Sequence, residues 1–168
     1  MMLLRLHTRT IALCALVPAA LVAASGDGLR DRILYNPSNS ISRGFYARID
    51  GSIDRGALVT VRALDVSPAY AAMRDFTDPR DRFIKRVAAT SGQVVCARGG
   101  DLFIDGELAA RRAQYDAEGR RLPTWSGCRT LNTDGILLLG DTPDSFDGRY
   151  WGPISRRLVE GVWRPFPG

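Results

Sequence analysis

The chain has 168 residues, of which 45% are hydrophobic and 24% are charged, and its formal net charge is +5. These values are typical of one globular domain with room for a small insert. After Arg5 and Arg9, the remaining 21 basic residues are balanced by 18 acidic ones, without a basic helix, a long charge block or a nucleic-acid motif. We therefore expect no nucleic acid among its partners.

The N-terminus has the pattern of an export or membrane segment. Arg5, His7 and Arg9 precede residues 10–26, TIALCALVPAALVAASG, which carry no charged side chain. This stretch is short for a membrane span and long for the apolar core of a signal peptide. Positive residues stay inside, so residues 1–9 are expected in the cytoplasm and residues 27–168 outside it. The segment is either a retained single anchor in the bacterial inner membrane or a cleaved signal that leaves a soluble periplasmic protein.

Residues 27–168 contain few long helical periods. Short runs rich in Val, Ile, Phe and Tyr alternate with Gly, Asp and Pro. These runs lie at 32–35, 44–49, 57–64, 82–89, 93–98, 102–108, 135–140 and 159–166. Runs of this kind between turn residues predict strands, and the glycines of 98–101 and 105–107 predict hairpin turns. The expected fold class is mostly β, with antiparallel sheets.

Two segments interrupt the strand pattern. Residues 67–81 predict either a short helix or a loop, and residues 109–131, which are polar and irregular, predict an inserted flap. Cys96 and Cys128 lie in the exported part, where two cysteines in one domain predict a disulfide. That disulfide would fasten the flap to the sheet. The chain has no Cys-x-x-Cys, which leaves a redox motif or a zinc ribbon unsupported.

The chemistry of the exported part is restricted by its lack of histidine, since His7 is the only one in the chain. This excludes a Ser-His-Asp triad, a Cys-His pair and a zinc site built on histidine. A hydrolase here needs another base, and the options are a carboxylate pair or a Ser-Lys pair.

Lys85 is a candidate base, because it is the one lysine among 23 Lys and Arg residues and lies in the apolar run 82–89. Burial lowers a lysine pKa, since the charged form loses its solvation, and a base needs a pKa nearer 7–8. Arginine keeps its proton and could not serve. The alternative is a chance lysine in an arginine-rich chain.

Residues 35–46, YNPSNSISRGFY, are a candidate nucleophile segment. Asn36-Pro37 imposes an extended or turned backbone, and Ser38 and Ser40, two positions apart, then point to the same side. One hydroxyl could attack a carbonyl while the other donates to the oxyanion. The alternative is a polar loop without chemistry.

Residues 140–153, GDTPDSFDGRYWGP, are the third candidate segment. Ser145 could bond the lysine amine and aim it, and Asp147 and Arg149 could form an ion pair that braces the loop. Asp141, Asp144 and Asp147 leave open an acidic surface loop or a cation site, although their spacing does not match a calcium loop. We expect neither a metal ion nor a cofactor, since a metal site would require these carboxylates to converge.

In this order, the three segments resemble the signal peptidase I family of Ser-Lys serine proteases (peptidase family S26), and within it the conjugation-type, TraF-like branch that matures pilin subunits. SNSISRGFY resembles the nucleophile box, RFIKRVAATSGQVV the lysine box and GDTPDSFDGRYWGPI the closing box. LFIDGEL resembles the hairpin that follows the lysine box of the family, whereas Gly148 and the segment YDAEGRRLPTW resemble the pilin-processing branch. The resemblance covers residues 32–165 and the N-terminal anchor. Ser42 stands where the family usually has Pro, a change that could loosen the backbone after the nucleophile.

The resemblance implies a serine endopeptidase with a signal peptidase I-like antiparallel β-sheet domain. It places the nucleophile on Ser40, the general base on Lys85 and the oxyanion donors on Ser38 and the Ser40 N–H, with support from Ser145, Asp147 and Arg149. The implied partners are a precursor or pilin substrate, the inner membrane and the conjugative transfer machinery. The acyl-enzyme would be resolved either by water or by the substrate's own amino terminus, which gives a cyclic peptide.

Two other functions remain open at the level of sequence. One is a general signal peptidase that removes leader peptides. The other is a non-catalytic periplasmic β-domain of a conjugation or secretion apparatus, in which Ser40 and Lys85 would lie far apart or Lys85 would be exposed. The peptidase hypothesis requires Lys85 Nζ within about 2.6–3.5 Å of Ser40 Oγ, and a separation beyond about 6 Å would exclude the pair.

Overall fold

A computed structural model describes residues 32–166. The expected cytoplasmic residues 1–9 and the expected anchor or signal segment 10–26 lie outside the described residues. Within residues 32–166, no helix is long and apolar enough to cross a membrane. The chain divides into two units, residues 1–34 and 35–168, and all of the features below belong to the second unit except the first residues of β1.

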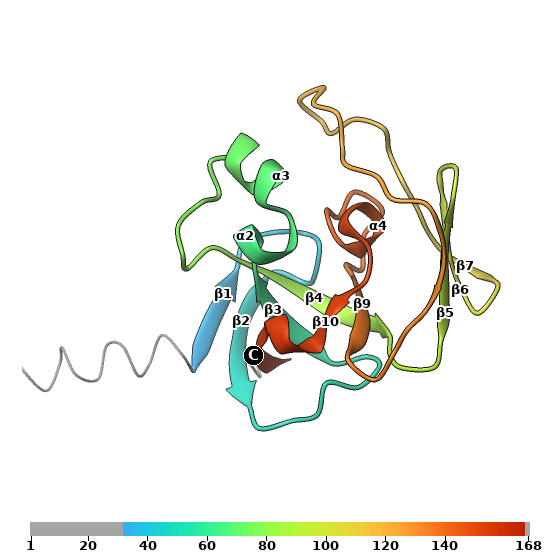
Figure 1. The fold of residues 1–168 in the computed structure, drawn as a ribbon. Coiled ribbons are helices and arrows are strands. Elements are labelled where there is room, and N and C mark those ends of the chain that lie inside the picture. The colour runs from blue at the N-terminus through green and yellow to red at the C-terminus, as the bar shows by residue number, and fades with distance from the viewer. Residues whose placement is uncertain (1–31, 167–168) are drawn as a thin grey trace, which may run out of the picture. The chain divides into compact units, whose positions relative to one another are not determined.

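The described residues are mostly in β-strands, as the sequence predicts (Figure 1). The strands are β1 (Ile33–Asn36), β2 (Gly44–Ile49), β3 (Leu58–Arg62), β4 (Arg82–Ala89), β5 (Val94–Arg98), β6 (Asp101–Ile104), β7 (Glu107–Arg111), β8 (Gly127–Thr130), β9 (Gly135–Leu139), β10 (Ile154–Ser155) and β11 (Val159–Pro165). Short helices are α2 (Ala63–Val66), α3 (Pro68–Met73), α4 (Gly148–Trp151) and the 3₁₀ turn η1 (Arg156–Leu158).

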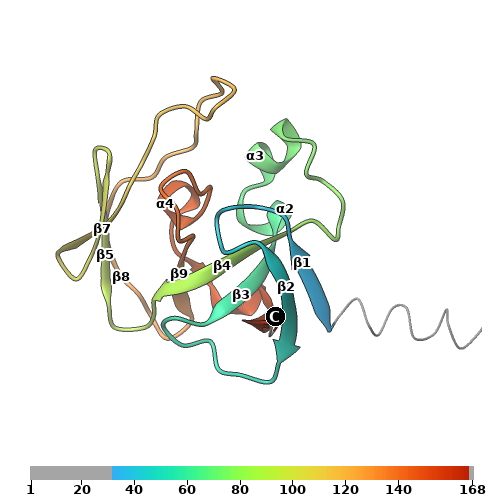
Figure 2. The same ribbon diagram turned by 180° about the vertical axis from the view of Figure 1, so that it is seen from behind.

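The strands form two sheets, shown from opposite sides in Figure 1 and Figure 2. The larger has the order β1-β2-β11-β3-β4-β9-β10, and the smaller has the order β7-β6-β5-β8. The pairings from β2 through β11, β3, β4 and β9 to β10, and those within the smaller sheet, are antiparallel. Strand β4 therefore lies inside the larger sheet, hydrogen-bonded to β3 on one side and β9 on the other.

Strand β9 contributes side chains to two hydrophobic clusters of the core. Successive side chains of a strand point to opposite faces. Leu137 and Leu139 accordingly pack into the cluster that contains Val95 and Leu102 of the smaller sheet. Ile136 and Leu138 pack into the cluster on the other face of β9, which contains residues of β3, β4 and β11. Burial on both faces explains why GILLL is continuously apolar rather than alternating.

Several boundaries differ from the sequence prediction. The run 57–64 leaves the sheet at Arg62, because Ala63 begins α2, and the segment predicted as a helix or a loop forms α3. The run 102–108 is two strands, since Asp105 and Gly106 have positive φ and reverse the chain. Strands β7 and β8 take up both ends of the predicted flap, so its irregular part is residues 112–126.

The predicted disulfide is present and lies in the smaller sheet. Cys96 on β5 and Cys128 on β8 are directly opposed in the strand register, with their Cα atoms 4.0 Å apart. The bond therefore fastens the end of residues 112–126 to the sheet. Figure 1 shows this segment leaving the smaller sheet and arching toward α3.

Candidate active site

The nucleophile segment is the loop between β1 and β2. Ile41 is fully buried and anchors the loop, whereas Ser38 is exposed and Ser40 is half-buried, so a substrate can reach both hydroxyls. The two Oγ atoms lie 3.0 Å apart. The prediction that these serines share one side of the loop is confirmed.

The backbone after Ser40 is held by hydrogen bonds where the family usually has a proline. The Ser42 carbonyl accepts from both the Asn36 amide, at 3.1 Å, and the Tyr46 hydroxyl. Asn36 is 4% exposed, and its side chain bonds several other groups of the same loop. The sequence pattern does not reveal this role, because Asn36 stands out in it only as the residue before a proline.

Lys85 lies on β4, on the face that also carries Phe83 and Val87, because alternate residues of a strand share a face. Its side chain is 3% exposed. Nζ donates to Ser40 Oγ at 2.8 Å and to Ser145 Oγ at 3.2 Å. The first distance lies within the range expected for a base and its nucleophile, and the second matches the expected contact of Ser145 with the amine.

Burial sets the protonation of Lys85. It lowers the pKa from 10.5 to about 8, since the charged amine has lost its water; the nearby carboxylate of Asp147 opposes this and Arg149 reinforces it. Because Asp147 and Arg149 carry opposite charges, they largely offset each other, and loss of solvation prevails. A pKa near 8 leaves an appreciable neutral fraction of the amine at neutral pH.

The third candidate segment, residues 140–153, follows β9 and is called the closing loop below. The predicted ion pair between Asp147 and Arg149 braces it. Asp147 and Arg149 are 0% and 3% exposed, and Arg149 Nε lies 2.8 Å from Asp147 Oδ1. Asp147 Oδ2 also accepts from the Gly140 N–H, and Arg149 donates to the carbonyls of Pro143 and Thr142. Burying an ion pair is tolerable when its remaining hydrogen-bonding positions are filled in this way.

A second ion pair joins β4 to the closing loop, which in turn contacts the nucleophile loop. Arg86 contacts both carboxylate oxygens of Asp141, at 2.9 and 2.8 Å, and this contact lowers the pKa of Asp141. The Asp141 N–H in turn donates to the Ser40 carbonyl at 2.6 Å. Lys85 thus contacts the Ser40 side chain directly, whereas Arg86 holds Asp141, whose N–H binds the Ser40 carbonyl.

The carboxylates of the closing loop do not converge as the metal-site alternative required. Asp141 faces Arg86, and Asp147 faces Arg149. Among residues 32–166, no three His, Cys, Asp or Glu side chains are grouped so that they could hold a metal ion.

The segment 112–126 packs on the closing loop. Trp125 Nε1 donates to the Gly148 carbonyl, and the Ala113 N–H donates to the Tyr150 hydroxyl. Tyr70 of α3 stacks on Phe146 of the closing loop with ring centroids 3.6 Å apart. The closing loop therefore contacts both this segment and α3.

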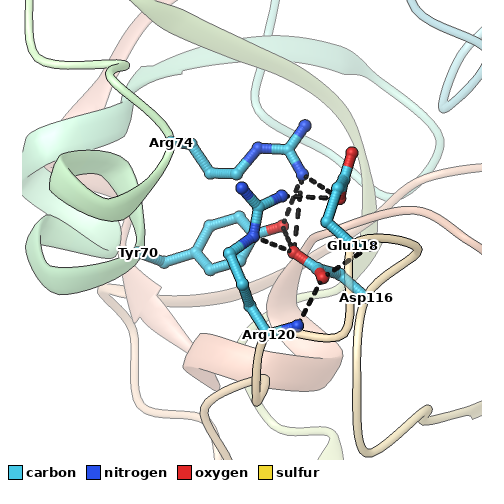
Figure 3. A network of polar contacts seen from close by, with 5 residues as sticks. All are labelled: Tyr70, Arg74, Asp116, Glu118 and Arg120. Atoms are coloured by element: carbon cyan, nitrogen blue, oxygen red, sulfur yellow. Dashed lines mark hydrogen bonds and ion pairs between the residues drawn. The ribbon is translucent and has the colours of Figure 1, made fainter.

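A polar network ties the tip of that segment to α3 (Figure 3). Asp116 accepts from Arg120 at 2.7 Å and from Arg74 and Tyr70 at 3.5 Å. Glu118 accepts from Arg74 at 3.0 Å. Tyr70 belongs to both the polar network and the aromatic stack, so the network is adjacent to the side chains packed around Phe146.

Comparison with known proteins identifies the family of the chain. A family model described as signal peptidase, peptidase S26, matches residues 14–166. Two Escherichia coli proteins named plasmid transfer protein TraF are similar: one is 32% identical over 167 residues, covering 89% of each chain. The other is 31% identical over 148 residues, covering 77% of this chain and 80% of the relative. A crystal structure of a signal peptidase I from Enterococcus faecalis matches with a TM-score of 0.39 and 21% identity, over 68% of this chain and 97% of that one. The chain belongs to the signal peptidase family, peptidase S26, and to its TraF-like members.

Proposed function

We propose that this protein is a serine endopeptidase that cleaves exported precursor proteins with Ser40 as the nucleophile and Lys85 as the general base. Membership of the peptidase family supports the reaction class. The observation that carries the assignment of residues is the 2.8 Å contact between Lys85 Nζ and Ser40 Oγ, made by an amine that is 3% exposed. A non-catalytic domain has no reason to bury its only lysine against an accessible serine.

Acylation follows from this geometry. Neutral Lys85 accepts the hydroxyl proton of Ser40 while Ser40 Oγ bonds to the carbonyl carbon of the scissile peptide. The negative charge that develops on the carbonyl oxygen is stabilised by the Ser40 N–H and the Ser38 hydroxyl. When the tetrahedral intermediate collapses, the C–N bond breaks, and Lys85 gives its proton to the leaving amine. Ser145 keeps the lysine amine aimed at Ser40 throughout.

Deacylation has two chemical outcomes. A water gives a proton to Lys85 as it attacks the ester carbonyl, the bond from that carbon to Ser40 Oγ breaks, and Lys85 returns the proton to Oγ, which releases a linear product. Alternatively, the substrate's own neutral amino terminus attacks the same carbon and gives a proton to Lys85. The bond to Ser40 Oγ breaks, Lys85 returns the proton to Oγ, and the product is a cyclic peptide. The two products differ in mass by one water, so mass spectrometry of a reaction mixture distinguishes them.

For the client we propose a conjugative pilin precursor, because the two relatives similar over most of the chain are named plasmid transfer proteins. The second candidate is a general signal peptidase, which the family description favours equally on its own. In either case we propose that residues 10–26 hold the enzyme in the inner membrane with its active site in the periplasm, or else serve as a cleaved signal. Sequencing the N-terminus of the mature protein, together with carbonate extraction of membranes, decides between these two arrangements.

The assignment is tested with Ser40→Ala and Lys85→Arg in the full chain. Arginine keeps the positive charge and most of the stem but cannot act as a base, so we expect both variants to fold and to lose at least about 10³-fold in kcat. Cleavage is measured on a conjugative pilin precursor and, in parallel, on a secretory preprotein. Normal cleavage by Lys85→Arg would refute the Ser-Lys mechanism.

The two substrates separate the candidate clients. Cleavage of the pilin precursor alone supports pilin maturation, whereas similar rates on both substrates support a general signal peptidase. If the wild type cleaves neither substrate and Ser40 does not react with a fluorophosphonate, which modifies activated serines, the protein is a non-catalytic domain.

A further inference from the structure

The nucleophile loop is organised around one buried side chain, Asn36. Its Nδ2 atom donates to the carbonyls of Ser38, Ile41 and Ser42 at 3.1, 2.9 and 3.1 Å. Its Oδ1 atom accepts from the Ser38 N–H at 3.1 Å and from Ser38 Oγ at 2.9 Å. These carbonyls precede and follow Ser40 in the sequence. The Asn36 side chain therefore joins the two halves of the loop on either side of Ser40.

The hydrogen-bond inventory of Ser38 shows why the Oδ1 contact matters. A serine hydroxyl has one proton to donate. Ser38 Oγ lies 2.9 Å from Asn36 Oδ1 and 3.0 Å from Ser40 Oγ, and its only other use in the proposed reaction is to donate to the oxyanion. While the hydroxyl donates to Asn36, its oxygen remains beside Ser40. When the oxyanion forms, the O–H bond has only to rotate, because Asn36 still holds Ser38 by its N–H.

We propose that Asn36 is a positioning residue for catalysis, which acts by keeping the Ser38 hydroxyl beside Ser40 and ready to donate to the oxyanion. The inference rests on the proposed peptidase mechanism. The burial of Asn36 supports it: at 4% exposure the amide has no water to compete for its hydrogen bonds, so its contacts fix the loop in one arrangement. A preorganised donor stabilises a transition state more than one that must first be ordered.

A double-mutant cycle on the full chain in detergent tests this role. The variants are Asn36→Ala, Ser38→Ala and the combination of the two, assayed with a fluorogenic peptide that has alanine at the first and third positions before the scissile bond. Asn36→Leu is made in parallel, because leucine has the same branching as asparagine and leaves no cavity. Tyr46→Phe is the matched control, since it also removes a hydrogen bond to the Ser42 carbonyl, whereas the Tyr46 hydroxyl forms no hydrogen bond with Ser38 among the described residues.

The expected result is a loss that depends on Ser38. Removing an oxyanion donor typically costs about 10²–10³-fold in kcat, which we expect for Ser38→Ala. We expect Asn36→Ala to lower kcat by about 30-fold or more with KM within about threefold, but by no more than about threefold when Ser38 is already alanine. Tyr46→Phe should have the same effect in both backgrounds.

Two results would overturn the inference. One is an equal loss of kcat for the Asn36 variants with and without the Ser38 hydroxyl. The other is loss of the fold in both Asn36→Ala and Asn36→Leu, which would assign the residue to stability instead. Ser40→Ala, assayed beside them, tests the proposed function independently. If Ser40→Ala retains activity, the proposed peptidase mechanism is wrong. If Ser40→Ala is inactive but the effects of the Asn36 and Ser38 substitutions on kcat are additive, the mechanism stands and only the role of Asn36 is refuted.

Discussion

At the scale of the residue, the proposed mechanism depends on the lowered pKa of a lysine that is buried in an apolar environment. Lys85 shares its strand face with Phe83 and Val87, and its amine finds only two hydroxyls, those of Ser40 and Ser145, within hydrogen-bond distance among the contacts of the described residues. Hydroxyls solvate an ammonium ion less well than water does, so the neutral amine is favoured. An arginine at this position would stay charged, so the proposed mechanism depends on the residue type at position 85 and not only on its charge.

The proposed mechanism predicts how the rate depends on pH, because it makes Lys85, with a pKa of about 8, the base. The base must be unprotonated, so kcat/KM should rise about tenfold per pH unit below that value and level off above it. Stopped assays between pH 5.5 and 10 on the fluorogenic peptide would measure this. A kcat/KM that is still rising at pH 10 would indicate a solvated lysine, and a kcat/KM that does not change with pH would indicate another base.

At the scale of the element, strand β9 brings the closing loop against the nucleophile loop. The strand ends at Leu139, and Gly140 follows at the point of closest approach. A Cβ atom at Gly140 would lie 2.1 Å from Ser145 Oγ and 2.7 Å from the Ser40 carbonyl oxygen. Residue 140 therefore has to be glycine for a steric reason, and both of its close neighbours belong to the proposed catalytic site.

Gly140→Ala is accordingly expected to displace Ser145 and Ser40 together. We expect a loss of about 10²-fold or more in kcat and a decrease of about 1–3 kcal/mol in the free energy of unfolding, as for other overpacked sites. Urea unfolding and steady-state kinetics measure the two effects. Gly100→Ala is the control, because the nearest atom to its Cβ is 3.8 Å away, and it should change neither. Wild-type kinetics in Gly140→Ala would contradict the packing described here.

Element prediction succeeded where side-chain pattern and turn residues agreed. GFYARI and RFIKRVAA were predicted at the bounds that β2 and β4 have in the structure. The predicted strand 57–64 is too long, because ALVTVRAL returns to apolar residues after Arg62 and pattern alone does not distinguish a strand from the short helix that follows. Strand β10 was missed, since two residues are too few for a period.

At the scale of the whole molecule, two sheets and the segment 112–126 support the site from different sides. The disulfide joins β5 to β8 through two cysteines that are 32 positions apart, one on each side of that segment. Among the described residues, neither cysteine forms a hydrogen bond with Ser40 or Lys85. The bond is therefore expected to affect stability more than the chemical step.

Replacing both Cys96 and Cys128 with serine tests this division. For a loop of this length, chain entropy predicts a loss of about 3–4 kcal/mol in the free energy of unfolding. The value of kcat on the fluorogenic peptide should stay within about threefold while the variant remains folded, and a reducing agent should lower the melting temperature of the wild type but not of the variant. A large fall in kcat at a temperature where the variant is folded would show that the smaller sheet positions the site directly.

From the sequence alone it was determined which residues could react: one lysine able to lose its proton, two serines on one side of a turn, and a closing segment with its own ion pair. Those are properties of residue type and short spacing, which local chemistry decides. The tertiary structure decided that Lys85 meets Ser40 across 45 positions and Ser145 across 60. Contacts at such separations depend on strand order and register, which no local pattern contains. The role proposed for Asn36 also emerged only from the structure, because a buried amide is recognised by what surrounds it.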